Sequence, residues 1–255
     1  MLTIGPAPSL TFSADGPFAA ALGDDGDANL VVRAARGLAA AVGCEPAVRL
    51  HLTKNLPVAS GIGGGSTDAA ACLRGLARLW EIDPASAAVR EVAATLGADV
   101  PACLNGRACY MGGIGTELMP APKLPPAGLL LVNPGIALST PSVYKARRGE
   151  FSPPMRFDTA PADAAALAAL LTERTNDLAA PAIALVPEIQ AVLDAIAAVP
   201  GCLLARMSGS GATCFGRFDD APAAAAAAGS MTGRDPGWWV AAGRLVEDAR
   251  VLDAA

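Results

Sequence analysis

The sequence predicts an α+β protein made of two domains. Its 255 residues are enough for two modest domains, since a domain typically takes about 100–200 residues. Strand-like and helix-like segments alternate irregularly, without the steady strand–helix order of a parallel α/β sheet. Residues 120–126 contain four prolines, which is typical of a boundary. We therefore expect one domain over residues 1–120 and a second over residues 127–255.

Hydrophobic periodicity places the elements of the first half. Apolar residues alternate with polar or small ones before residue 22 and again over residues 48–53, which indicates short or half-buried strands. Apolar residues three and four apart indicate helices, and the acidic turn at residues 24–27 precedes the first of them. The helices are expected over residues 29–43, from about Ser66, and over residues 84–97.

The second half is expected to hold about four strands and three alanine-rich helices. A continuous apolar run ends at Asn133-Pro134-Gly135, and two short apolar runs flank a Ser-Gly-Ser-Gly loop. The strands are expected at residues 128–132, 203–207 and 213–218, with one more between 238 and 252. The helices are expected near residues 161–172, 186–198 and 223–228.

Composition and charge exclude several classes of protein. The formal net charge is −5 and no basic stripe is present, which argues against a nucleic-acid partner. No uncharged apolar run approaches the length of a membrane span, and the N-terminus lacks the pattern of a signal peptide. We expect a globular, cytoplasmic protein, and its oligomeric state is left open.

The six cysteines form no C-x-x-C pair, and the chain has a single histidine, His51. A zinc site would need clustered cysteine and histidine ligands. We therefore expect reduced, mostly buried thiols and no metal site made by side chains.

A glycine-rich segment between a strand and a helix carries the strongest functional signal. It consists of Pro57, Val58, Ala59, Ser60, Gly61, Ile62, Gly63, Gly64, Gly65, Ser66 and Thr67. Four glycines in five positions let the backbone bring several N–H groups close to one anion, and the next helix points its N-terminus at the same place. The segment is predicted to bind phosphate. The alternative is a flexible loop followed by a well-capped helix.

Two common phosphate loops do not fit this segment. A P-loop needs a lysine directly before the Ser/Thr, and Gly65 stands there. A G-x-G-x-x-G dinucleotide fingerprint counted from Gly61 ends on Ser66 instead of glycine.

The glycine segment resembles the ATP-binding loop of the GHMP kinases, the superfamily of galactokinase, homoserine kinase, mevalonate kinase and phosphomevalonate kinase. Five further segments resemble, in order and spacing, the 4-diphosphocytidyl-2-C-methyl-D-erythritol kinase family. They are residues 29–35, 97–101, 139–144, 176–178 and 208–212. The resemblance runs from about residue 24 to the C-terminus.

This resemblance implies a two-domain fold, a ribosomal protein S5 domain 2-like domain followed by a ferredoxin-like domain. It implies ATP as co-substrate, with Mg²⁺ as the ion that usually accompanies it, and a small-molecule cytidine diphosphate substrate phosphorylated on its 2-hydroxyl in isoprenoid biosynthesis. Two alternatives stay open: another GHMP kinase, of the homoserine or mevalonate type, and a non-catalytic nucleotide-binding relative.

Asp99 is the candidate catalytic residue. A helix is expected to end at Gly97, and Pro101 suits the first turn of the next one. On local sequence alone, Asp99 could simply cap that helix. The resemblance makes it the carboxylate that accepts the proton of the substrate hydroxyl as the oxygen attacks the γ-phosphate.

Three weaker candidates remain. The Ser208–Ala212 loop is either a plain hairpin turn or, by resemblance, a support for the phosphate loop and the substrate. Lys54 lies either beside the nucleotide or exposed at a strand end. Tyr144 is either a stacking partner for cytosine or a core aromatic.

The family also begins with a Lys-Ile-Asn-Leu strand and an Asp-Gly-Tyr-His turn, and neither motif precedes Asn29. The resemblance therefore implies a start about 40 residues late for the family, the loss of a catalytic lysine, and a weak or inactive kinase.

Overall fold

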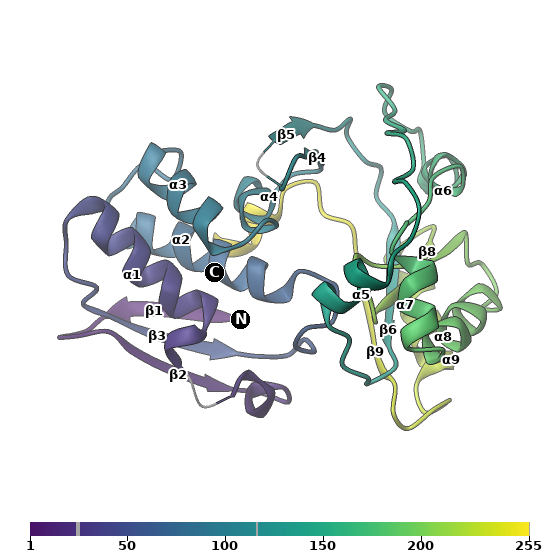
Figure 1. The fold of residues 1–255 in the computed structure, drawn as a ribbon, viewed down its shortest axis with the longest axis horizontal. Helices are drawn as coiled ribbons and strands as arrows, with labels where there is room; N and C mark the ends of the chain where they lie inside the picture. The colour runs from purple at the N-terminus through teal and green to yellow at the C-terminus, as the bar shows by residue number, and fades with distance from the viewer. Residues whose placement is uncertain (24–25, 116, 255) are drawn as a thin grey trace. The chain divides into compact units, whose positions relative to one another are not determined.

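The computed structural model describes residues 1–23, 26–115 and 117–254 (Figure 1). The chain forms two compact units, and the main division falls between Pro120 and Ala121, in the proline-rich stretch. Two short segments group differently from the expected halves. Ala59–Ile62 belongs to the second unit, and the chain from Asp248 onward belongs to the first. Hydrogen bonds described below account for both segments.

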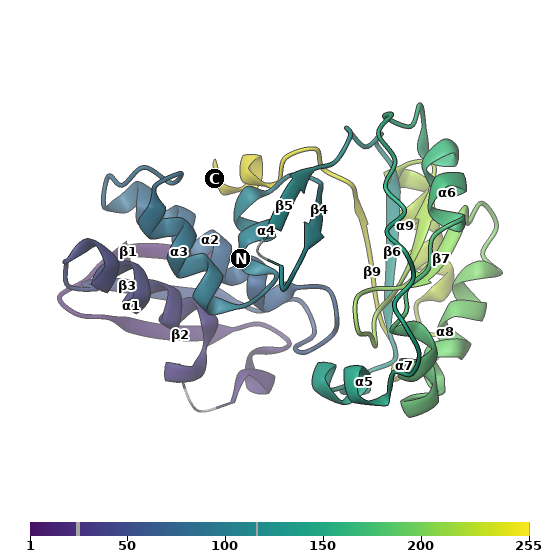
Figure 2. The same ribbon diagram turned by 45° about the horizontal axis from the view of Figure 1, so that its top comes forward.

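The first unit is a three-stranded sheet with helices packed on one face (Figures 1 and 2). The strand order is β1-β3-β2, in which β3 is antiparallel to β1 and parallel to β2. The strands are β1 (Leu2–Pro6), β2 (Thr11–Asp15) and β3 (Val48–Thr53). The helices are α1 (Leu30–Val42), α2 (Gly64–Leu79), α3 (Ala87–Leu96) and α4 (Val100–Asn105). The sheet and the first three helices confirm the expected order of elements.

Local caps explain where these helices begin and end. The Asn29 side chain accepts a hydrogen bond from the Val31 amide at 2.9 Å, and Gly43 ends α1 in the left-handed conformation at φ 72°. Helix α3 begins at Ala87 instead of Pro84 because Asp83 first forms a turn, in which its carboxylate accepts from the Ala85 amide at 2.9 Å.

A hairpin of β4 (Cys109–Gly112) and β5 (Glu117–Pro120) completes the first unit and was not expected from the sequence. These strands have four residues each, too few for periodicity to reveal them.

The second unit is a four-stranded antiparallel sheet in the order β7-β8-β6-β9. Its strands are β6 (Gly128–Asn133), β7 (Leu204–Met207), β8 (Cys214–Phe218) and β9 (Trp239–Arg244). Its helices are α5 (Thr140–Ala146), α6 (Ala164–Thr172), α7 (Ala179–Leu185), α8 (Glu188–Ala197) and α9 (Ala221–Met231). The four strands and the helices α6, α8 and α9 match the expectation. The seven-residue helices α5 and α7 were missed.

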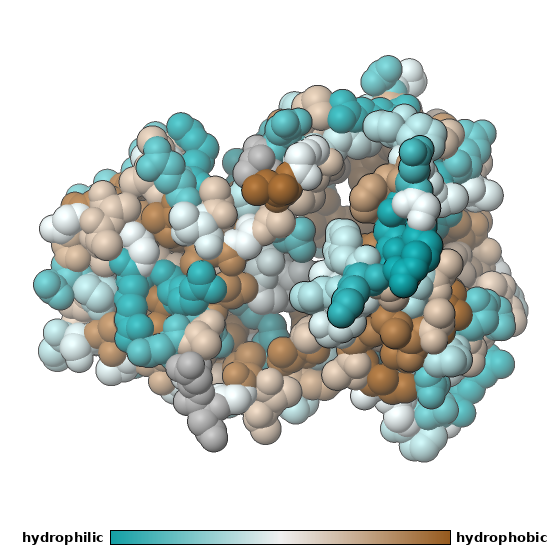
Figure 3. Space-filling model, viewed as in Figure 1, coloured by the Kyte–Doolittle hydropathy of each residue, from teal (hydrophilic) through white to brown (hydrophobic). Residues whose placement is uncertain are grey.

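Short 3₁₀ helices cover Ala19–Leu22, Gly26–Ala28 and Ala249–Ala254. The expected acidic turn begins at Asp24 and Asp25, which lie outside the described residues. Within the part of the chain that the structure describes, none of the helices combines the length and the apolar character that crossing a bilayer requires. On the face shown in Figure 3, hydrophilic and hydrophobic residues are interspersed in small patches.

All six cysteines are free thiols, as expected, although Cys44 is exposed. Cys72 and Cys214 are buried, and burial raises the pKa of each thiol to about 12. These two groups therefore pack as small apolar side chains and stay protonated at neutral pH.

Candidate active site

Helix α2 begins in the glycine loop with an N-terminus that no side chain caps. Its N-cap is Gly63, at φ 67° and ψ 20°, and the first helical hydrogen bond runs from the Thr67 amide to the Gly63 carbonyl at 2.8 Å. The amides of residues 64–66 have no partner within the helix, as in every α-helix. The helix was expected from about Ser66 and begins two residues earlier, so Ser66 and Thr67 lie inside its first turn. An uncapped end of a 16-residue helix is a place for an anion.

The preceding part of the loop is fixed by the Ser208–Ala212 segment of the second unit. Ser208 Oγ donates to the Gly61 carbonyl at 2.9 Å, and the Thr213 amide donates to the Ser60 carbonyl at 3.1 Å. A Cβ on Gly61 would lie 2.8 Å from the Ser208 carbonyl and against that of Gly211, and the φ of Gly61 is 76°. Gly61 therefore needs to be glycine for both space and conformation.

Three of the five segments that resemble one family lie together beside this contact, namely residues 139–144, 176–178 and 208–212. Asn176 Nδ2 donates to the Met207 carbonyl at 3.1 Å and to the Gly209 carbonyl at 2.8 Å. Thr140 Oγ1 lies 2.7 Å from Ser210 Oγ. Ser208–Ala212 is thus both a connection between β7 and β8 and an anchor for the glycine loop. A plain hairpin turn is the wrong reading of it.

Lys54 lies beside the N-terminus of α2 and is buried, with 4% of its surface exposed. Its Nζ is 2.6 Å from Asp68 Oδ2, and a Cβ added to Gly64 would lie 3.3 Å from the same nitrogen. Of the two alternatives for Lys54, the exposed strand-end lysine is therefore wrong. Asp68 was not singled out from the sequence, although it stands one turn after Gly64, where a helical side chain can reach the start of the helix.

Asp99 is the N-cap of α4, but its side chain makes no capping hydrogen bond. The residue is exposed and its backbone is helical, at φ −85° and ψ −16°. A helical ψ turns the side chain away from the amides that a cap must reach. The reading of Asp99 as a mere helix cap is wrong, and its carboxylate is accessible for other chemistry.

Helix α4 packs on α2 and brings Asp99 to the same region of the first unit as Thr67. Thr67 Oγ1 lies 3.6 Å from Cys103 Sγ, and the Cys103 amide donates to the Asp99 carbonyl at 3.0 Å. Burial is the main cause that raises the pKa of Cys103, and the negative charge of Asp99 adds to it.

The structure also limits how a metal ion could be held. Among the described residues, no three His, Cys, Asp or Glu side chains lie together as a metal site. The Ser66 and Thr67 hydroxyls and the partly exposed Asp68 carboxylate are oxygen donors of the kind that Mg²⁺ takes alongside phosphate oxygens. These residues fit an ion that arrives with a phosphate ligand.

Comparison with known families assigns both halves of the chain to one class. The family model described as "GHMP kinases N terminal domain" matches residues 29–107, and "GHMP kinases C terminal" matches residues 160–234. The first match includes the glycine loop and the uncapped start of α2. The fold and the site therefore define a GHMP kinase.

Individual relatives narrow this class. A 4-diphosphocytidyl-2-C-methyl-D-erythritol kinase of Rhodospirillum rubrum is 53% identical over 98% of this chain and 82% of its own. The one of Cereibacter sphaeroides (strain KD131) is 54% identical over 94% of this chain and 84% of its own. The chain belongs to the 4-diphosphocytidyl-2-C-methyl-D-erythritol kinase family.

Solved structures agree with this assignment. A crystal structure of 4-(cytidine 5'-diphospho)-2C-methyl-D-erythritol kinase shares 34% identity, with a TM-score of 0.74 over 94% of this chain and 84% of that one. A homoserine kinase from Cytophaga hutchinsonii reaches a TM-score of 0.70 over 97% of this chain and 85% of that one. At 15% identity, it shows the shared fold alone.

Proposed function

We propose that this chain transfers the γ-phosphoryl group of ATP to the 2-hydroxyl of 4-diphosphocytidyl-2-C-methyl-D-erythritol, in the methylerythritol phosphate pathway of isoprenoid biosynthesis. The proposed substrate is supported mainly by the 53% identity, over 98% of this chain, with the 4-diphosphocytidyl-2-C-methyl-D-erythritol kinase of Rhodospirillum rubrum. The phosphate-binding half of the proposal is supported by the uncapped N-terminus of α2.

In this proposal the glycine loop holds ATP through its backbone. The loop comprises residues Pro57 to Thr67. The backbone amides at the start of α2, which have no partner within the helix, donate hydrogen bonds to the phosphates. Lys54 adds a fixed positive charge next to Gly64. Bound Mg²⁺ would neutralise charge on the phosphates, with the Ser66 and Thr67 hydroxyls as neighbouring donors.

Asp99 acts as the general base. Its carboxylate is exposed and makes no capping bond, so it is able to accept the proton of the substrate hydroxyl as that oxygen attacks phosphorus. The enzyme would work in the cytoplasm on dissolved small molecules. Tyr144, half exposed at 53%, is not a core aromatic and is accessible for stacking on the cytosine ring.

The test is a phosphoryl-transfer assay with three acceptors in parallel. The protein is incubated with ATP, Mg²⁺ and either 4-diphosphocytidyl-2-C-methyl-D-erythritol, homoserine or mevalonate. ADP release and the ³¹P spectrum of the product are recorded. We expect a new phosphate monoester on the 2-hydroxyl of the first acceptor alone.

The same assay separates the alternatives. Faster transfer to homoserine or mevalonate would contradict the proposed substrate. ATP binding at equilibrium, without transfer to any of the three, would indicate a non-catalytic nucleotide-binding relative.

A further inference from the structure

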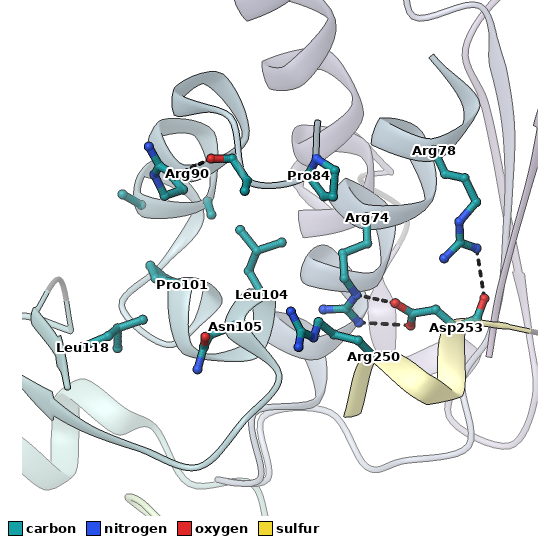
Figure 4. A pocket seen from close by; sticks show the side chains of 13 residues that line it. Arg74, Arg78, Pro84, Arg90, Pro101, Leu104, Asn105, Leu118, Arg250 and Asp253 are labelled. Carbon is teal, nitrogen blue, oxygen red and sulfur yellow. Dashed lines mark hydrogen bonds and ion pairs between the residues drawn. The ribbon is translucent and has the colours of Figure 1, made fainter. Parts of the chain in front are cut away.

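A cavity of about 750 Å³ lies in the first unit, lined mainly by α2, α3, α4 and the 3₁₀ helix Ala249–Ala254 (Figure 4). We propose that this cavity is a second binding site, for a small organic phosphate with an apolar body. Its volume falls within the roughly 300–1,000 Å³ that is typical of small-molecule sites.

The charge of the lining is strongly positive. Four arginines (Arg74, Arg78, Arg90 and Arg250) and one carboxylate (Asp253) line the cavity. The Asp253 carboxylate is held by Arg74, with one contact of 3.1 Å from Nη2 to Oδ1. Arg250 pairs with Asp248, which does not line the cavity. Positive charge therefore exceeds negative charge.

Arg78 and Arg90 retain hydrogen-bonding capacity. Arg78 Nη1 donates to the Asp253 carbonyl at 3.0 Å, and Arg90 Nη1 donates to the Ala85 carbonyl. Both acceptors are neutral backbone groups, and both side chains belong to exposed residues. A guanidinium has five N–H donors in a planar fork that matches a phosphate group. The positive charges of these two residues are thus available to an anion.

The remaining wall is apolar. Pro84, Pro101, Leu104 and Leu118 line the cavity together with the alanines of α3. Figure 4 shows Leu104 projecting between the Arg90 side and the Arg74 side. Inorganic phosphate would leave this surface unused, whereas an alkyl or ring group attached to the phosphate would cover it. The lining therefore favours an organic phosphate over the free ion.

The cavity is separate from the glycine loop. Arg74 and Arg78 stand 10 and 14 residues after Gly64 on the same helix, which corresponds to about 15 and 21 Å along its axis. The glycine loop lies at the N-terminus of α2, whereas the C-terminal half of α2 lines the cavity. A ligand here would touch α4 as well, the helix that begins next to Asp99.

The experiment is calorimetric titration of the 255-residue protein with n-hexyl phosphate in saturating AMP-PNP, a nucleotide that is not turned over. Inorganic phosphate and 1-hexanol serve as comparison probes. We expect one site per chain, about tenfold or more tighter for hexyl phosphate than for either comparison probe. Charge-assisted hydrogen bonds and apolar burial each contribute on that scale.

Two variants locate the site. Arg78→Gln/Arg90→Gln removes charge, and Ala94→Trp fills the space without removing charge. Each should weaken hexyl phosphate binding about tenfold or more. Arg33→Gln, at an exposed arginine on α1, should leave it unchanged. Wild-type affinity for hexyl phosphate in both cavity variants would overturn the proposal, and so would the absence of binding in saturating AMP-PNP. No phosphoryl transfer is measured, so this result is independent of the proposed kinase activity.

Discussion

Lys54 Nζ lies 2.6 Å from Asp68 Oδ2, so that one ion pair joins the chain just after β3 to the second turn of α2. The Lys54 side chain is almost fully buried, with 5% of its surface exposed, while the Asp68 side chain is 21% exposed. The pair spans the whole glycine loop, from residue 54 to residue 68. It therefore fixes the distance between the two ends of the loop that the proposed function assigns to ATP.

The two halves of this ion pair should respond unequally to mutation. Asp68→Asn leaves a buried ammonium unpaired and should lower the free energy of unfolding by about 3 kcal/mol. Lys54→Met should lower it by less, because water reaches the remaining carboxylate. Denaturant unfolding checks this. The control is Lys123→Met, at a solvent-exposed pair with Glu247, where a change of less than about 1 kcal/mol is expected. Equal losses at Asp68 and Lys123 would contradict the prediction.

Gly64→Val should abolish ATP binding. The valine side chain would crowd Lys54 Nζ, 3.3 Å from the new Cβ, and would stand among the free amides of α2. Calorimetric titration should show an affinity reduced about 100-fold or more. Gly229→Val is the matched control, since Gly229 lies in α9 with nothing within 4 Å of its Cβ position. Unchanged affinity in Gly64→Val would exclude the loop as the phosphate site.

Asp99→Asn should lower phosphoryl transfer about 10²–10⁴-fold and leave the Kd for ATP unchanged. Because Asp99 makes no capping bond, the unfolding free energy should change by less than about 0.5 kcal/mol. Asp220→Asn is the comparison, since Asp220 does cap α9 by accepting from the Ala223 amide at 2.8 Å, and it should leave transfer intact. A near wild-type kcat in Asp99→Asn would remove Asp99 from the mechanism.

Gly61→Ala should destabilise the protein through the contact with Ser208–Gly211. Both Gly61 and Gly233 have positive φ, at 76° and 79°, but only Gly61 has backbone atoms against its Cβ position. Gly61→Ala should therefore be less stable than Gly233→Ala by about 1–3 kcal/mol, measured as unfolding free energy. Similar losses in both variants would mean that backbone conformation alone matters.

Asp248 should make stability depend on acid pH. Its hydrogen bonds with Arg250, and then that with Arg107, hold the pKa of this carboxyl below its ordinary value of 3.8. A depressed folded-state pKa contributes stability at pH above 3.8, and the contribution is lost as pH falls through the folded-state value.

Asp248→Asn should accordingly be less stable than wild type at neutral pH, and the gap should narrow below pH 3.8. Denaturant unfolding from pH 7 to pH 2.5 measures both curves. Asp219→Asn, at an exposed position, should run parallel to wild type throughout. A gap that stays constant down to the lowest pH would rule out this ion pair as its source.

Local sequence was enough to predict most elements of the fold. Asn29 and Gly43 bound α1 through hydrogen bonds and backbone conformations that involve only neighbouring residues. The alternation over residues 48–53 likewise predicted β3, which spans Val48–Thr53. Helices α5 and α7 and the β4–β5 hairpin were missed, because short segments owe their structure to packing against distant parts of the chain.

In the candidate site, too, some features follow from local sequence and others depend on packing between distant residues. The glycine spacing of residues 61–65 predicts a phosphate site from local backbone physics, and that assignment stays a prediction. Periodicity could not show that Lys54 is buried against Asp68, since a strand-end lysine and a helix-start aspartate are both ordinary at the surface. The proposed organic-phosphate cavity could not be predicted from the sequence, because its arginines come from three separate segments of the chain.

The sequence by itself determined the fold class, the family and the segment that is expected to hold phosphate, because these depend on periodicity, caps and motif spacing that are written in neighbouring residues. Only the tertiary structure decided that Ser208 anchors Gly61, that Lys54 pairs with Asp68 and that Asp99 leaves its helix uncapped. The first two depend on where distant segments of the chain meet, and the third depends on the orientation of one side chain. Hydrogen bonding and burial determine these arrangements only when the whole chain is packed.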